Sequence, residues 1–264
     1  DEPEIVRDLH ADFIRAGARV ISLNSYTMTP ERLARDGNIN DFQKLQLAAV
    51  NAATSARDRV AIAGVKIAGC LPPLVASYKA EVAPEYEAML ASYSKIVAIQ
   101  APHVDLFLCE TMSSIVEAKA ALVAAKKSGL PVWVSLTIED NDKGVLRSGE
   151  LLADAVTMLD EFGADAKLLN CSKPEAILVS WSKMKSDQGL TGAYGNGFTS
   201  IDSLKPGGTV KSMESRSDLG PAAYAEFALQ WANQGAALIG GCCEVGPAHI
   251  KALARRLTEA GYSV

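Results

Sequence analysis

The chain alternates between two kinds of segment. Short, almost wholly apolar runs cover residues 20–26, 60–69, 105–110, 131–138, 167–171, 190–196 and 237–243. Longer segments with the composition and end signals of helices cover residues 6–18, 39–58, 84–102, 113–129, 151–164, 173–187, 221–236 and 247–261. Because the apolar runs do not alternate with polar residues, they suit strands buried on both faces of a parallel sheet. Strands that alternate with helices predict repeated βα units.

The count of elements predicts the fold class. Seven strands, eight helices and a helix at the front fit an α/β protein with a (β/α)8 TIM barrel whose first strand is absent from residues 1–264. An open barrel is the alternative. No Pro/Ser-rich linker, low-complexity tract or close internal repeat divides the chain. We therefore expect residues 1–264 to form a single TIM-barrel domain.

Composition narrows the classes of function. The 264 residues are 48% hydrophobic and 22% charged, as in a globular protein, and the net charge of -5 argues against a nucleic-acid or membrane-surface partner. No apolar run approaches the roughly 18–20 residues that span a bilayer. The charged opening DEPEIVRDLH does not read as a secretory signal. The five irregularly spaced cysteines do not indicate a disulfide framework, so we expect a reducing, cytoplasmic setting.

Three of the cysteines fall at predicted strand ends. In a barrel of this kind the carboxyl ends of the strands share one rim, and catalytic residues gather there. Cys171 ends the fifth apolar run, and Cys242 and Cys243 end the last. Neighbouring side chains on a regular strand point to opposite faces, so a shared role for this pair needs an irregular backbone. Gly240 and Gly241 permit one.

Three converging thiolates would suit Zn²⁺, and three protein ligands with an open fourth position is the pattern of a catalytic zinc. We expect His249 to point along the last helix and not to complete the site. One alternative is that the cysteines are small buried hydrophobes, which is our interpretation of Cys70 and Cys109. A strained disulfide between Cys242 and Cys243 is another.

The ligand type indicates a chemistry. Zinc with three thiolate ligands is a poor Lewis acid for making hydroxide, but it can bind a substrate thiol and favour its ionised form. A thiolate held in this way is a nucleophile at neutral pH, and its natural partner is a soft electrophile such as an activated methyl group. The cysteine pattern therefore favours alkyl transfer to a thiol.

Motifs around these cysteines resemble a known family. GGCC (240–243), PAHI (247–250) and NCS (170–172) are together similar to the zinc-dependent homocysteine S-methyltransferases. That group includes betaine–homocysteine methyltransferases and the homocysteine module of cobalamin-dependent methionine synthase. Weaker similarity runs along essentially the whole chain, in AGARVISLNSY (16–26), AGCLPPL (68–74), LCET (108–111), VSLTIED (134–140) and LRSGE (146–150).

The resemblance implies a set of metal and substrate residues. Cys171, Cys242 and Cys243 would bind zinc within a TIM barrel, and the sulfur of homocysteine would take the fourth position. Glu110 would receive the substrate amino group; as a strand-end acid it could instead cap the following helix.

Further residues are assigned to the substrate pocket and to the methyl donor. Asn24, Asn170 and Thr137 would line the homocysteine pocket, with turn or helix-capping roles as the alternative for the two asparagines. A sulfonium or quaternary ammonium donor is best held by aromatic faces, although an aromatic residue at a strand end can simply be packing. The candidates for donor binding are Tyr26, Tyr194 and Phe198.

Two departures from the family pattern stand out. The family opens with a strand that ends in an Asp-Gly-Gly type motif whose acid contributes to the substrate site, and these residues contain no such opening. Glu244 stands where a glycine commonly follows GGCC, which adds charge near the metal. Residues 148–150 lie on a polar loop that reads as a helix start or a lid.

We therefore expect a zinc-dependent enzyme that transfers a methyl group from a small onium donor, such as S-methylmethionine or betaine, to homocysteine and so makes methionine. Its partners would be these small molecules, without nucleic acid or membrane, and the oligomeric state is left open. The alternatives are the homocysteine-activating module of a cobalamin-dependent methionine synthase, or a non-enzymatic barrel that holds zinc on four protein ligands.

Overall fold

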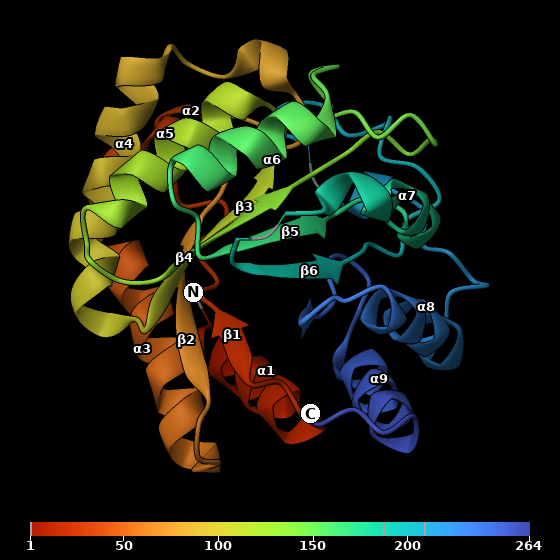
Figure 1. Ribbon diagram of the computed structural model, residues 1–264. Coiled ribbons are helices and arrows are strands. Elements are labelled where there is room, and N and C mark those ends of the chain that lie inside the picture. Colours follow the sequence, from red (N-terminus) through yellow and green to blue (C-terminus); the bar gives the residue numbers. More distant parts are fainter. Residues whose placement is uncertain (1, 187, 209) are drawn as a thin grey trace.

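The computed structural model describes residues 2–186, 188–208 and 210–264. Seven parallel strands form one sheet, in which each strand pairs with its neighbour in chain order. The sheet curls, and helices lie along its outer side (Figure 1). The strands are β1 (Val20–Ser22), β2 (Lys66–Leu71), β3 (Leu106–Met112), β4 (Val132–Leu136), β5 (Ala166–Asn170), β6 (Leu190–Tyr194) and β7 (Leu238–Ile239).

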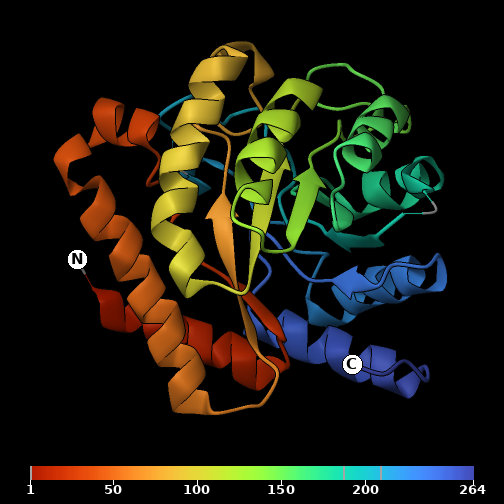
Figure 2. The same ribbon diagram turned by 60° about the vertical axis from the view of Figure 1, so that its left-hand side comes forward.

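Each strand is followed or preceded by a helix that covers the outside of the sheet (Figure 2). The α-helices are α1 (Pro3–Ala16), α2 (Pro30–Asp36), α3 (Phe42–Val60), α4 (Tyr86–Gln100), α5 (Ile115–Lys126), α6 (Leu152–Glu161), α7 (Pro174–Ser180), α8 (Pro221–Asn233) and α9 (Pro247–Glu259). Within the described parts of the chain, none of them combines the length and apolar character that crossing a membrane requires.

The predicted number of strands is confirmed in the described residues, whereas the predicted bounds of several elements are corrected. The start of the predicted strand 60–69 is wrong, because α3 continues to Val60 and ends at Ala61 in the left-handed conformation (φ 55°). Helix α2 was not predicted; Thr29 caps it by accepting a hydrogen bond from the Arg32 amide at 3.2 Å. The predicted helix 173–187 ends at Ser180 and continues as a short 3-10 helix, and its last predicted residue lies outside the described residues.

The sheet is open between its first and last strands. Among the described residues, no ladder joins β1 to β7, although every other pair of successive strands is joined. Helix α1 packs against α9, so the helical layer is continuous where the sheet is not. The parallel α/β architecture and the leading helix are thus confirmed, whereas closure by an eighth strand stays a prediction.

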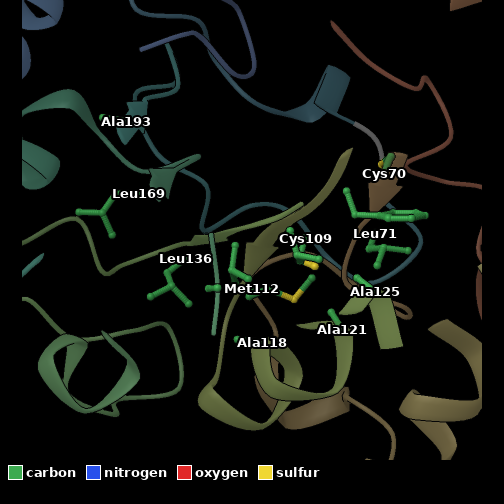
Figure 3. Close-up of a cluster of buried hydrophobic side chains, with 14 of the residues drawn as sticks. Cys70, Leu71, Cys109, Met112, Ala118, Ala121, Ala125, Leu136, Leu169 and Ala193 are labelled. Carbon is green, nitrogen blue, oxygen red and sulfur yellow. The ribbon is translucent and has the colours of Figure 1, made fainter. Parts of the chain in front are cut away.

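The outward face of the sheet forms the main core with the helices. Cys109 and Met112 of β3 and Leu136 of β4 point toward one face of α5 (Figure 3). That face is made largely of alanines, which let the helix lie close to the sheet; they include Ala118, Ala121 and Ala125. These side chains are wholly or almost wholly buried, so the strands are held rigidly beneath the loops that follow them.

The inward face of the sheet is a smaller apolar layer. Ala68 of β2 packs with Leu106 and Leu108 of β3, and Trp133 and Tyr194 extend the layer across the curl. Because side chains alternate along a strand, the residues that follow these at two-residue spacing also face inward, toward the carboxyl ends. The candidate site lies at that end of the inner face.

Candidate metal centre and substrate site

The three predicted cysteines meet at the carboxyl ends of β5 and β7. The Sγ atom of Cys171 lies 2.9 Å from that of Cys242 and 3.7 Å from that of Cys243, and the latter two are 4.0 Å apart. Tetrahedral ligation with Zn–S bonds of about 2.3 Å implies sulfur separations of about 3.8 Å. The thiols are free, so the predicted alternative of a disulfide is not found in this structure.

An irregular backbone brings the adjacent cysteines together, as the sequence predicted. Strand β7 ends at Ile239, and the chain turns so that the Val245 amide donates to the Cys242 carbonyl at 3.1 Å. Gly241 is required there, because a Cβ atom would lie 2.0 Å from a Val245 methyl carbon. Glu244 completes the turn with φ 65°, and its side chain accepts a hydrogen bond from Ser215 at 2.6 Å.

The chemistry of this donor set fits a thiophilic metal. The pKa of Cys243 falls to about 4 because the thiols of Cys171 and Cys242 donate to its sulfur, while the pKa of Cys242 rises for the same reason and through burial. The hydrogen bonds from its neighbours therefore favour the ionised form of Cys243. His249 is not a ligand: its Nδ1 accepts from the Gly246 amide at 3.2 Å and so caps α9. In the described part of the chain, the cluster offers three protein ligands.

A tyrosine that the sequence did not predict contacts this cluster. The Tyr78 hydroxyl lies 2.9 Å from Cys171 Sγ, and the residue has φ 64° in the loop after β2. The guanidinium of Arg147 lies over its ring, 5.6 Å from the centroid. Phe198, one of the predicted donor-binding residues, packs with Tyr78 and the cysteines in a small separate cluster.

Glu110, the predicted amino-group acceptor, lies at the end of β3 on the inward face. Its carboxylate accepts a hydrogen bond from the Cys70 thiol at 3.0 Å, and burial raises the pKa of this acid to about 7. The alternative role of helix cap is wrong, because the Ser114 side chain caps α5. Cys70 and Cys109 are both buried in the main core, as expected of small hydrophobes, but Cys70 also makes this hydrogen bond to Glu110.

Asn170 fixes the backbone beside Glu110. Its Oδ1 accepts from the Thr111 amide at 3.0 Å, and its Nδ2 donates to Thr111 Oγ1 at 2.8 Å. This pair holds Thr111 at φ 62°, and Cys171 follows at φ 49°. Left-handed backbone at non-glycine residues is uncommon, and such strained residues cluster at functional sites. Thr137 is buried beside these residues, with its hydroxyl 3.2 Å from that of Ser172.

The remaining predicted residues are not gathered with the cysteines to the same degree. Asn24 is exposed beyond β1. Tyr26 bonds to Ser77 at 2.8 Å, and Arg32 already lies over its ring, 5.4 Å from the centroid. Tyr194 lies in the inner layer, and its buried hydroxyl has no hydrogen-bond partner among the described residues. Of the predicted donor-binding aromatics, Phe198 is the one that packs on the cluster.

The polar loop at residues 148–150 is held by hydrogen bonds at the start of α5. Glu150 accepts from the Ile115 amide at 2.8 Å and from the Ser148 hydroxyl at 2.6 Å. The Ser148 amide in turn donates to the Ser113 carbonyl at 3.0 Å. These bonds hold the loop against the first turn of the helix, where the helix dipole favours a carboxylate.

The fold and the cluster together define a class: a curled parallel α/β barrel-like protein with three cysteines that could hold a metal at the carboxyl ends of its strands. A family model described as homocysteine S-methyltransferase matches residues 1–257. The chain therefore belongs to the homocysteine S-methyltransferase family.

Curated relatives and solved structures agree with this assignment. The homocysteine S-methyltransferase of Escherichia coli K12 is 28% identical, over 97% of this chain and 85% of its own, and homocysteine S-methyltransferase 1 of Arabidopsis thaliana is 27% identical, over 97% and 83%. The metallated form of the E. coli homocysteine methyltransferase MmuM superimposes with a TM-score of 0.79 at 25% identity, covering 97% of this chain and 85% of that one.

Proposed function

We propose that this protein transfers a methyl group from a small onium donor to the sulfur of homocysteine, with Zn²⁺ held by Cys171, Cys242 and Cys243. The observation that carries the proposal is the meeting of three sulfurs within 4.0 Å of one another at the end of the sheet where Glu110 is buried. When bound, zinc would supply a Lewis acid that favours the ionised form of a thiol. Membership of the homocysteine S-methyltransferase family supports the choice of substrate.

The residues of the chain divide the work of binding. The cysteines fix the position of the substrate sulfur by holding the metal, and Glu110 receives the substrate ammonium. During transfer one C–S bond forms and the donor C–S⁺ or C–N⁺ bond breaks. The donor leaves as a neutral thioether or amine, and the proton of the substrate thiol is lost on ionisation. Tyr78 and Phe198 border the cluster and would exclude water from the reacting groups.

Fewer residues of the site point to the identity of the methyl donor than to that of homocysteine. Phe198 supports an onium donor best, because its ring packs on the cluster and aromatic faces attract such cations. S-methylmethionine and betaine are the donors we propose. A reducing cytoplasm is the location we propose, because adjacent free thiols oxidise readily elsewhere. The non-enzymatic barrel with four protein ligands is disfavoured, since three converge in the described residues.

The first prediction tests metal and activity together. The purified protein should contain about one zinc per chain and form methionine from homocysteine with at least one onium donor, which metal analysis and a donor panel would measure. Cys171→Ser should lose both properties, because a tetrahedral thiolate site does not tolerate the loss of one of three protein ligands. Cys109→Ser serves as the control, since this buried cysteine lies in the main core. Full activity of the metal-free protein would contradict the proposal.

A further inference from the structure

Cys70 and Glu110 form a buried pair on neighbouring strands. In the ladder between β2 and β3, Cys70 lies opposite Leu108, and Glu110 follows two residues later on the same face. Cys70 is 1% exposed and Glu110 is 9% exposed. The Cys70 thiol donates to Oε1 of Glu110 at 3.0 Å. The Cys70 thiol is not part of the cluster of Cys171, Cys242 and Cys243, so metal binding does not explain its contact with Glu110.

The two oxygens of the Glu110 carboxylate have different surroundings. Oε1 is anchored by Cys70, whereas no hydrogen bond reaches Oε2 from the residues that the structure describes. A carboxylate held through one oxygen presents the other in a fixed direction. The anchor is itself rigid, because Gln100, which is fully buried, accepts from the Cys70 amide at 2.9 Å.

Among the described residues, none of the groups that act on Glu110 carries a positive charge. The titratable groups that act on it come from six strands or the loops after them: Tyr26, Cys70, Cys109, Cys171, Tyr194 and Cys243. Thiols and phenols are neutral or anionic, so they do not stabilise a carboxylate by charge. Burial raises the pKa of Glu110, and the hydrogen bond from Cys70 opposes that rise. A cation for this site must therefore come from the ligand.

We propose that Cys70 is a positioning residue for substrate binding, whose thiol holds Glu110 so that Oε2 meets the ammonium group of homocysteine. The inference rests on the proposed function, in which Glu110 receives that ammonium. A thiol suits the position because it combines a weak donor with the packing of a small hydrophobe. The same side chain therefore packs in the buried core and orients the acid.

The test compares three variants across neutral pH. Cys70→Ala should raise the homocysteine KM about three- to tenfold at neutral pH and move its pH dependence upward by about one unit, with kcat little changed, because a hydrogen bond to a charged group is lost. Cys70→Ser keeps a hydrogen-bond donor, so its homocysteine KM and pH dependence should lie close to those of the wild type. Cys109→Ala is the matched control: it removes the neighbouring buried thiol, which faces the outer core, and should keep the wild-type KM.

A second measurement follows the hydrogen bond between Cys70 and Glu110 directly. Carboxyl-carbon NMR of the purified protein, with the Glu110 signal assigned from Glu110→Gln, should show its titration shifted upward in Cys70→Ala and unshifted in Cys109→Ala. An unchanged titration and KM in Cys70→Ala would overturn the inference. If Glu110→Ala itself leaves the homocysteine KM unchanged, the proposed role of Glu110 fails, and the positioning role of Cys70 fails with it. A raised KM in Glu110→Ala beside an unaltered Cys70→Ala would remove the positioning role alone.

Discussion

At the scale of single residues, two buried glutamates are distinguished by their surroundings. Glu110 and Glu117 are only seven positions apart, and burial raises the pKa of each to about 7. Glu117 turns to the first turn of α5, where it accepts from the Ser113 amide at 3.2 Å. Glu110 turns inward, where the Cys70 thiol holds one oxygen. The same residue type therefore serves a helix in one case and, in our proposal, a binding site in the other.

The second prediction follows from the charge of Glu110. Glu110→Ala should raise the homocysteine KM about tenfold or more while zinc stays bound, because the substrate ammonium loses its partner in a partly desolvated site. Glu110→Gln should lie between this variant and the wild type. Steady-state kinetics beside metal analysis provide the measurement. Loss of zinc in Glu110→Ala would show instead that the residue is structural.

The pH dependence has a defined sign. The pKa of Glu110 in the folded protein, about 7, lies above its ordinary value of 4.5, so the carboxylate that binds an ammonium is fully present only above neutral pH. We expect the homocysteine KM to rise as the pH falls through about 7, and this limb to disappear in Glu110→Gln. Glu117→Gln is the matched control, because it replaces an acid with a similarly raised pKa outside the inner face. If the homocysteine KM of Glu110→Gln still rises as the pH falls through about 7, the rise must come from another titrating group.

At the scale of elements, a helix braces the loops that carry the cysteine pair. The hydroxyl of Tyr224, on α8, lies 2.8 Å from the Gly240 carbonyl and 3.2 Å from the Gly195 carbonyl. The Cys242 amide donates to the same Gly195 carbonyl at 3.0 Å, and the Gly197 amide donates to the Cys243 carbonyl at 2.9 Å. The segments after β6 and β7 thus act as one unit, supported from behind by α8.

The third prediction tests this brace. Tyr224→Phe should lower the free energy of unfolding by about 1–2 kcal/mol, because the Gly195 and Gly240 carbonyls lose the hydroxyl that they share. Zinc affinity should fall as well, which competition with a chelator would measure. Tyr262→Phe provides the control, since its exposed hydroxyl bonds only to Asn233 in the described residues. Zinc affinity equal to that of the wild type in Tyr224→Phe would show that the loops hold their geometry without the helix.

At the scale of the whole molecule, the cysteine cluster joins distant parts of the chain. The contacts between Cys171 and the adjacent cysteines span 71 and 72 residues, and Tyr78 reaches Cys171 across 93. Such a site exists only in the folded state, so a ligand that binds it stabilises the fold by mass action.

The fourth prediction concerns this linkage. Zinc in excess over its dissociation constant should raise the melting temperature of the metal-depleted protein by about 5 °C or more. Cys171→Ser should lose that increase, whereas Cys109→Ser should melt lower but keep it. Differential scanning calorimetry with and without zinc makes the comparison. An equal increase in all variants would indicate binding away from the cluster.

The sequence by itself determined the order of elements and the residue types at their ends. Seven apolar runs and their intervening helices predicted a parallel sheet, because burial on both faces removes alternation from a strand. The rule that catalytic residues gather at the carboxyl ends of such strands placed Cys171 on the same rim as the cysteine pair. The glycines before that pair predicted the irregular turn that aims both sulfurs at one point.

Only the tertiary structure decided which side chains meet across the sheet. Cys70 is an ordinary member of an apolar run, and its partnership with Glu110 depends on the register between β2 and β3. Tyr78 is a single aromatic residue in a loop without periodicity, so nothing local indicates that its hydroxyl reaches Cys171. Periodicity reports which face of its own element a residue occupies. Contacts between elements depend on register, curl and loop path, which are settled when the whole core packs.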